Sequence, residues 1–519
     1  MTEQTKKKTG IFNKFLNGVE HVGNRLPDPS ILFFLICVAL AVITWLVSLF
    51  NVSVKHPGTG KVVEVKNILS IDGLRMILND AIKNFSEFPA LGIVLAVMLG
   101  VGVAEKSGYF DKLLVQVVHK APKKLIVPSI IIIGILGNAA GDAAPIILPP
   151  LTAMVFIKLG YHPIAGLAMA YASSLGGFAA NLMLGMSDAM TYAFTEPATR
   201  IVSDHTKINV AMNWYFIAAS VIILLPAVYW VTMKFVIPRL GKFDTSDAQI
   251  EVDSSTQDLT PQESRALMWA NIGMGVVLVG IILCALPHNS FLRNAKTGSL
   301  IDDAPLFNGI ALIILLLFLV PGLIYGFMMK EFKDTKDLGR MLADSMSSMG
   351  SFIVIVFFAA QVLGFLQWSN LGVVIAVKGA EALKGQNGVV LIIGVILLSA
   401  IINMLIGSAS AKWGLLAPIF IPMLMLLGFH PALTQMLYRI GDSISNPITP
   451  MMPYLPLLLQ YAQKYDENMK LGSLLSSLMP YTVILSIVWP IFIIIWYLLG
   501  IPLGPGGVLH MYHFTLILK

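Results

Sequence analysis

Charged residues are scarce in this sequence. Only 12% of the 519 residues are Asp, Glu, Lys or Arg, 56% are hydrophobic, and the mean hydropathy is +0.79. A soluble globular chain carries about 25% charged residues. We therefore expect an integral membrane protein in contact with the lipid bilayer. The net charge of +6 does not indicate a nucleic-acid partner, because the basic residues lie at the ends of apolar runs and set the topology.

Cysteine and the common catalytic motifs are also rare or missing. Cys37 and Cys284 both lie in apolar runs, so neither a disulfide framework nor a cysteine-based metal site is supported. No G-x-x-x-x-G-K-[ST] motif occurs, which argues against an ATP-driven pump. H-E-x-x-H and G-x-S-x-G are missing too, so a membrane-embedded enzyme is disfavoured. We expect no cofactor.

Apolar runs are abundant and predict an all-α polytopic membrane protein with nine transmembrane helices. A helix needs about 20 apolar residues to cross the hydrocarbon core. The first run has no small-residue cleavage site after it, so we expect it to be retained. The predicted spans are 30–50, 88–105, 163–186, 213–236, 267–286, 306–328, 347–368, 431–462 and 475–499.

Two further apolar stretches, 125–159 and 389–427, have small and polar centres. The centres are Gly137 to Pro145 and Gly407 to Gly414. Irregular backbone is tolerated at membrane depth only where protein or a wet cavity satisfies it. We interpret both stretches as re-entrant helical hairpins.

The distribution of Lys and Arg orients the chain. Most of the 35 basic residues fall on the inner side if the amino terminus is cytoplasmic, and nine crossings then leave the carboxyl terminus outside. The predicted organisation is a cytoplasmic segment 1–29, a first repeat 30–236, a cytoplasmic linker 237–266, a connecting span 267–286, a second repeat 306–499 and an external tail 500–519.

An internal repeat supports the division into two units. Leu148 to Pro163 aligns without gaps on Leu416 to Pro431, and both stretches end in Leu-Gly-aromatic-His-Pro. One extra span between the units forces the second to start on the opposite side, so the repeat has inverted topology. Inverted repeats with broken helices are typical of secondary transporters. The predicted breaks lie at 173–185 and 441–450, where Ser, Gly, Asn and Pro collect.

Arg439 and Asp442 are the most informative polar pair. A charge in a span costs at least about 2.5 to 3.5 kcal/mol at the bilayer centre unless it is paired or wet. Their i,i+3 spacing places them on one helical face. Two readings stay open: the two residues neutralise each other, or Arg439 binds a substrate carboxylate while Asp442 binds a coupling ion.

Carboxylates and amides near the hairpin tips suit a hard cation such as Na⁺ better than a transition metal. Asp142 lies in the first tip, where it could instead cap a helix, and Lys412 lies in the second. Asn138 and Asn403 lie near the tips. Asp188 lies at the outer end of the first broken span, where it could also be a solvated loop residue.

Ser410 and Trp413 in the second tip could bind a polar and an aromatic ligand group. Trp413 could equally serve packing or interfacial anchoring. His162 and His430 occupy equivalent positions before prolines, which indicates structural turns and not a zinc pair.

The second half carries a long motif. Ser408-Ala-Ser-Ala-Lys-Trp413, Gly428-Phe-His-Pro431 and Tyr438-Arg-Ile-Gly-Asp-Ser-Ile-Ser-Asn-Pro-Ile-Thr-Pro450 closely resemble the p-aminobenzoyl-glutamate transporter (AbgT) family of the ion-transporter superfamily. The resemblance extends over essentially the whole chain. It implies a homodimer in the bacterial inner membrane that moves p-aminobenzoyl-glutamate, a folate breakdown product, by secondary transport.

The resemblance also implies which residues matter. The family's important positions fall on Asp188, Asn403, Ser410, Trp413, Pro431, Arg439, Asp442 and Pro450. We therefore expect substrate binding by Ser410, Trp413, Arg439, Asp188, Pro431 and Pro450, and binding of Na⁺ by Asp442, Asn403, Asn138 and Asp142 unless the coupling ion is H⁺. The alternative function is a proton-driven exporter of sulfonamide-type antimetabolite drugs.

Overall fold

The computed structural model describes residues 29–55, 61–120, 125–140, 143–241, 243, 259–300, 304–347, 349–452 and 454–511. Asp142, the cytoplasmic segment predicted for 1–29 apart from its last residue, most of the linker 237–266 and the end of the external tail lie outside the described residues. Within the described ranges, the regular structure is helical apart from one short hairpin of β1 (Ser53–Lys55) and β2 (Val62–Glu64).

The helices before residue 260 come in the following order. They are α2 (Pro29–Ser48), α3 (Ile71–Ser86), α4 (Pro89–Lys106), α5 (Tyr109–Lys120), α6 (Ile126–Leu136), the 3₁₀ turn η2 (Gly137–Ala140), α7 (Ala143–Lys158), α8 (Pro163–Gly176), α9 (Met186–Thr199), α10 (Trp214–Val231), the π turn η3 (Thr232–Val236) and α11 (Ile237–Leu240).

The remaining helices begin with a long one that stands between two series. They are α12 (Pro261–Ala285), α13 (Pro305–Asn308), α14 (Ile310–Met329), α15 (Thr335–Ser347), α16 (Gly350–Trp368), α17 (Leu371–Leu383), α18 (Gly388–Asn403), α19 (Ala409–Leu426), α20 (Pro431–Ser445), α21 (Leu455–Gln463) and α22 (Leu471–Leu498).

The two series follow one pattern. Each begins with an apolar helix (α2, α14) and a short helix with one polar face (α3, α15), and each ends with a long apolar helix (α10, α22). Packing is reciprocal, because α4 packs against α14 while α16 packs against α2, and α15 packs against α4 while α3 packs against α16. The order of helices therefore repeats on either side of α12.

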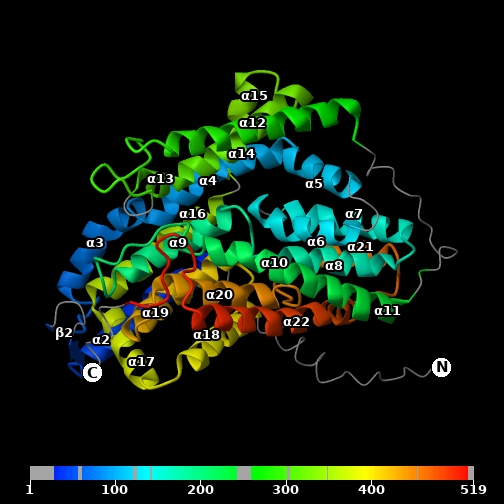
Figure 1. The fold of residues 1–519 in the computed structure, drawn as a ribbon. Coiled ribbons are helices and arrows are strands. Elements are labelled where there is room, and N and C mark those ends of the chain that lie inside the picture. The colour runs from blue at the N-terminus through cyan, green and yellow to red at the C-terminus, as the bar shows by residue number, and fades with distance from the viewer. Residues whose placement is uncertain are drawn as a thin grey trace, which may run out of the picture.

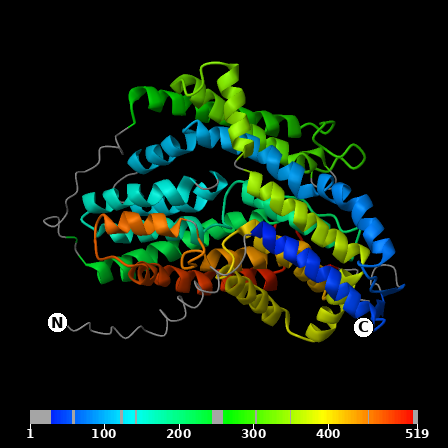
Figure 2. The ribbon, with the colours of Figure 1, turned by 180° about the vertical axis from the view of Figure 1, so that it is seen from behind.

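The helices form two stacked groups (Figures 1 and 2). In both views α12, α14 and α15 lie along one side of the molecule, and α18 and α22 lie along the opposite side. The broken helices α8 and α20 run between them, packed on α6, α7, α18 and α22. Their side chains are buried along the whole length of both helices.

Six helices in the described part of the chain are long and apolar enough to cross a membrane. They are α2, α10 extended through α11, α12, α14, α19 and α22. The shorter α6, α7 and α18 are apolar as well. The protein is thus a multi-pass helical membrane protein. The helix α19, predicted as one arm of a hairpin, is itself of spanning length.

Several predicted boundaries shift by a few residues, and two of the shifts have an identifiable local cause. The helix predicted to end at 236 continues to Leu240 through the π turn, where the Thr232 hydroxyl bonds to the Val228 carbonyl at 2.8 Å. The connecting span begins at Pro261 and not at 267, because Thr260 and Glu263 form a capping box. Hydropathy alone misses a helical turn made of polar residues.

The carboxyl-terminal segment 500–511 packs onto the protein. The backbone N–H of Phe216 donates to the Leu503 carbonyl at 3.0 Å, and the N–H of His430 donates to the Leu509 carbonyl at 3.0 Å. The N–H of Met511 donates to the carbonyl of Gly428 at 2.8 Å. Leu503 and Leu509 are buried. This part of the predicted tail therefore covers the amino-terminal end of α20.

Candidate functional site

Two interrupted helices meet at the centre of the site. Helix α8 ends at Gly176 and the chain becomes helical again at α9, whereas α20 ends at Ser445 and α21 begins at Leu455. The helix breaks predicted at 173–185 and 441–450 are thus confirmed. The Ala179 N–H donates to Ser443 Oγ at 3.1 Å, and Asn446 Nδ2 donates to the Leu175 carbonyl at 3.2 Å. Protein groups therefore satisfy the backbone that the breaks expose.

Each broken helix accepts a hydrogen bond from an asparagine of a neighbouring segment. Asn138 in η2 donates through Nδ2 to the Ser174 carbonyl at 2.7 Å, and Asn403 at the end of α18 donates through Nδ2 to the Asp442 carbonyl at 2.8 Å. Both asparagines are buried. The two predicted cation ligands thus occupy matching positions in the two series of helices.

Arg439 pairs with Asp188. Its Nη1 lies 2.6 Å from Asp188 Oδ1, its Nη2 lies 3.3 Å from Ser187 Oγ, and the other Asp188 oxygen accepts from the Gly185 N–H at 2.9 Å. Both charged side chains are at most 4% exposed. Asp188 is therefore a buried residue that caps α9, and the interpretation of a solvated loop residue is wrong.

The pairing of Arg439 with Asp442 is also wrong. Side chains on a helix lean toward its amino end, so the guanidinium of Arg439 leads away from Asp442 to the first turn of α9. The carboxylate of Asp442 forms its ion pair with Lys412 from α19 instead. Each charge on α20 is thus neutralised by a different neighbouring helix.

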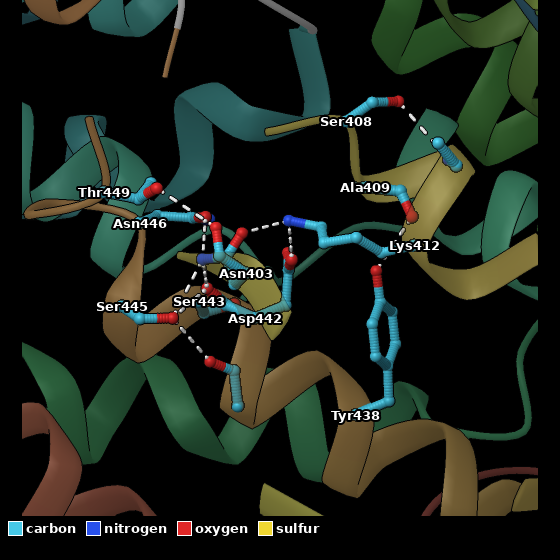
Figure 3. A network of polar contacts seen from close by, with 12 residues as sticks. Asn403, Ser408, Ala409, Lys412, Tyr438, Asp442, Ser443, Ser445, Asn446 and Thr449 are labelled. Carbon is cyan, nitrogen blue, oxygen red and sulfur yellow. Dashed lines mark hydrogen bonds and ion pairs between the residues drawn. The ribbon is translucent and has the colours of Figure 1, made fainter. Parts of the chain in front are cut away.

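Lys412 joins α19 to α20 (Figure 3). Its ammonium contacts Asn403 Oδ1 and Asp442 Oδ1, and its side chain is 1% exposed. Asn403 Nδ2 also bonds to Ser445 Oγ and Asn446 Oδ1, each at 2.8 Å. Two residues predicted to bind a cation, Asn403 and Asp442, therefore lie together around a cation that the protein supplies.

The indole of Trp413 is enclosed. It stacks on the Tyr438 ring with centroids 4.4 Å apart and an interplanar angle of 19°. Its Nε1 donates to the Thr191 carbonyl at 3.0 Å and to Thr195 Oγ1 at 2.9 Å, and the side chain is fully buried. The arrangement supports a packing role, with one ring face already covered by a tyrosine.

The other predicted residues have identifiable places. Ser410 Oγ lies 3.1 Å from the hydroxyl of Ser408, which caps α19. Pro431 is the first residue of α20, and Pro450 lies in the irregular segment after it. His162 and His430 each accept the N–H two residues ahead, at 3.3 and 3.2 Å, so both cap helices. The prediction of structural turns at these histidines is confirmed.

One polar chain was missed by the sequence analysis. The Thr195 hydroxyl donates to Gln435 Oε1 at 2.6 Å, and Gln435 Nε2 donates to Asn213 Oδ1 at 2.7 Å. Asn213 Nδ2 then donates to the carbonyl of Ala432 at 2.8 Å. A glutamine inside an apolar span was the available signal, together with Thr191, Thr195 and Thr199 at i,i+4 spacing.

The site holds two buried cations and two buried carboxylates. Arg439 with Asp188, and Lys412 with Asp442, sum to zero charge. No group of three or more His, Cys, Asp or Glu that could hold a metal ion occurs among the described residues. Such a site can bind an organic anion when a cation is released from its carboxylate, and the released carboxylate then requires a cation of its own.

Buried charges between broken helices in an apolar helical protein define the class of membrane transporters. The AbgT putative transporter family matches residues 14–511, and the chain belongs to this family. Members of the family are transporters and not enzymes.

Similar proteins cover nearly the full chain. The p-aminobenzoyl-glutamate transport protein of Escherichia coli is 37% identical over 495 residues, which is 95% of this chain and 96% of that protein. The crystal structure of the YdaH transporter of Alcanivorax borkumensis is 36% identical, with a TM-score of 0.87 over 92% of this chain and all of that chain. MtrF of Neisseria gonorrhoeae, described within a class of antimetabolite efflux pumps, is 40% identical, with a TM-score of 0.89 over 95% of this chain and all of that chain.

Proposed function

We propose that this protein carries p-aminobenzoyl-glutamate across a bacterial inner membrane by cation-coupled secondary transport. The observation that carries the proposal is the 37% identity, over almost the whole chain, to a transport protein named for this substrate. The chemistry of the site agrees, because p-aminobenzoyl-glutamate has two carboxylates and one aromatic ring. A guanidinium, an ammonium and a stacked aromatic pair lie on adjacent turns of α19 and α20.

We assign substrate contact to Arg439 first. A guanidinium binds a carboxylate through two parallel hydrogen bonds, and Asp188 holds this guanidinium when no substrate is bound. The other proposed substrate residues are Asp188, Ser410, Trp413, Pro431 and Pro450. Pro431 and Pro450 would act through the shape of α20 and its break.

We assign the coupling cation to Asp442 and Asn403, with Asn138 and Asp142 in the corresponding half. The supporting observation is the matched pair of asparagine contacts to α8 and α20. The coupling ion is Na⁺ or H⁺ in this proposal. Carboxylate and amide oxygens are ligands that suit Na⁺.

We propose nine spans, two re-entrant hairpins and an inverted repeat, with a cytoplasmic amino terminus and a homodimeric assembly. The matched order of helices on either side of α12 and the reciprocal packing of α4 on α14 and α16 on α2 support the repeat. An even number of crossings in the first unit followed by α12 would invert the second. In this scheme 30–236 and 306–499 are the two repeats, and 237–266 is a cytoplasmic linker.

A second function is favoured by one observation. MtrF, at 40% identity, is described within a class of antimetabolite efflux pumps. Proton-driven export of sulfonamide-type antimetabolites would use the same path in the opposite direction.

Flux measurements test both functions. Purified protein is reconstituted in liposomes, and uptake of radiolabelled p-aminobenzoyl-glutamate and of a sulfonamide is followed under imposed Na⁺ or pH gradients. Gradient-driven p-aminobenzoyl-glutamate uptake supports the first function. If an imposed proton gradient drives sulfonamide across the membrane in the direction opposite to the protons, and p-aminobenzoyl-glutamate does not move, the second function replaces the first.

A further inference from the structure

Lys412 is an uncommon residue for its position. It lies in the first turn of α19 and its side chain is 1% exposed. The amino-terminal end of a helix disfavours a cation, and a lysine buried in an apolar protein is costly. Its position therefore depends on the oxygens that face it.

Those oxygens come from two other helices. The ammonium contacts Asn403 Oδ1 at the end of α18 and Asp442 Oδ1 on α20. In the described part of the chain Asp442 Oδ1 has no partner besides this ammonium. The side-chain amide of Asn403 is oriented by its other bonds, because its nitrogen donates to the Asp442 carbonyl, Ser445 Oγ and Asn446 Oδ1.

Helix ends add to the preference for a positive charge. Asn403 is the last residue of α18, and Asp442 lies three residues before the end of α20. The carboxyl-terminal ends of helices carry partial negative charge and favour cations. Interrupted helices in secondary transporters coordinate Na⁺ or H⁺ with such ends.

We propose that Lys412 is the resident cation of the site formed by Asn403 and Asp442. Its ammonium occupies the position that a sodium ion would take, so Na⁺ does not bind to these oxygens while Lys412 remains there. A dry site with one carboxylate cannot hold two cations side by side, because their repulsion is poorly screened. Na⁺ and the ammonium are therefore competitors for this site.

This inference rests on the proposed assignment of Asn403 and Asp442 to the coupling cation, and not on the identity of the substrate. It adds a condition to that assignment. Sodium can couple to transport through Asp442 only in a conformation in which Lys412 has moved away. Lys412 thus controls sodium binding through its charge, because its ammonium occupies the oxygens of Asn403 and Asp442.

Cation-dependent stability of the purified full-length protein tests the inference. The thermal midpoint Tm is measured by tryptophan fluorescence in NaCl and in KCl at equal ionic strength. The variants are Lys412→Met, Lys412→Arg and the double variant Lys412→Met with Asp442→Asn. Methionine fills a similar volume without the charge, arginine keeps the charge, and the double variant has no charge at either position.

Any Na⁺-specific rise in the Tm of wild type and of Lys412→Arg should equal that of the double variant, because Asn138 and Asp142 are unchanged in all three. Lys412→Met should show a saturable rise in Tm with Na⁺ and not with K⁺, because a cation that binds only the folded protein stabilises it by mass action. The part of this rise that exceeds the wild-type response should vanish in the double variant. Recovery of folded Lys412→Met only from Na⁺ buffers gives the same support.

Two results overturn the inference. One is a saturable Na⁺ response in wild type that equals that of Lys412→Met and is lost in the double variant, since Na⁺ would then bind beside Lys412. The other is a Lys412→Met variant whose Tm or loss of fold is the same in both salts. Neither result bears on the identity of the substrate, because the flux of p-aminobenzoyl-glutamate tests that proposal separately.

Discussion

Arg439 and Asp188 are buried charges that depend on one another. Their side chains are at most 4% exposed and lie 2.6 Å apart. Removing one partner of a buried pair costs about 3 to 5 kcal/mol, whereas removing both can be nearly neutral. The pair therefore allows a structural role to be separated from ligand binding.

We predict that Asp188→Asn loses about 3 kcal/mol or more of stability, because it leaves the Arg439 guanidinium buried and unpaired. The double variant Arg439→Met with Asp188→Asn should recover most of that loss and still not bind p-aminobenzoyl-glutamate. Thermal unfolding and substrate binding of purified protein measure the two effects. Transport by the double variant would show that Arg439 serves only to neutralise Asp188.

Arg439→Lys provides the matched test of geometry. It keeps the charge opposite Asp188, so the fold should be retained with a smaller loss of stability. A lysine lacks the planar fork of donors that binds a carboxylate through two bonds. We expect substrate affinity to fall at least about tenfold, equivalent to about 1.4 kcal/mol. Unchanged affinity would argue against direct contact with a carboxylate.

At this scale the sequence predicts which charges are buried and not which ones pair. Arg439 and Asp442 stand out because charges are rare in apolar spans. Their partners, Asp188 and Lys412, come from segments far away in the chain that only the packing of α9 and α19 against α20 brings close. The i,i+3 spacing suggested a local pair that the lean of helical side chains disfavours.

Helix crossings set the geometry of the two series. At the crossing of α18 and α20, a methyl group on Gly441 would lie 2.6 Å from Ser399 Cβ and would also meet the Ile396 carbonyl. At the crossing of α6 and α8, a methyl group on Gly134 would lie 2.5 Å from Ser173 Cβ. In each series one glycine lets a neighbouring helix, α6 or α18, approach the broken helix closely.

We predict that Gly441→Ala destabilises the protein by about 1 to 3 kcal/mol, because the added methyl group forces α20 away from α18. The displaced Asp442 would also lose its contact with Asn403. Gly394→Ala on the exposed face of α18 is the matched control, since nothing lies within 4 Å of its added methyl group. Thermal unfolding of both variants measures the difference, and equal midpoints would contradict the close crossing.

At the level of elements, long apolar helices and the breaks in α8 and α20 can be predicted from composition. Short helices such as α9 and α17 were missed, because they lack the length and hydropathy of a span and form by packing on neighbours. The full burial of Asp188 and Thr195 follows from α9 being such a packed helix and not a loop.

The orientation of the whole molecule follows from the proposed nine spans. In that scheme the segment after α12 is external and the segment after α14 is cytoplasmic. We predict that Ala295→Cys reacts with an impermeant maleimide added to intact cells and that Lys336→Cys reacts only after permeabilisation. Both positions are exposed, so burial does not account for a difference. The background for both substitutions is a variant in which Cys37 and Cys284 are replaced.

The class of the whole molecule was predictable because it depends on composition summed over many residues. The number of spans is harder to predict, since α8 and α20 are too short to cross alone and α19 is long enough. Hydropathy counts residues in a window, whereas a broken helix crosses in two pieces with irregular backbone between them.

The packed carboxyl-terminal segment constrains how α20 can move. Its backbone holds the amino-terminal end of α20 through His430 and Gly428, while the far end of the helix runs into the irregular segment after Ser445. A helix that is held at one end can tilt about that end, and its far end then moves most. Asp442 lies about 18 Å from His430 at a rise of about 1.5 Å per residue, so a tilt of about 10° displaces it by about 3 Å. A tilt of this size is thus large enough to separate Asp442 from Lys412.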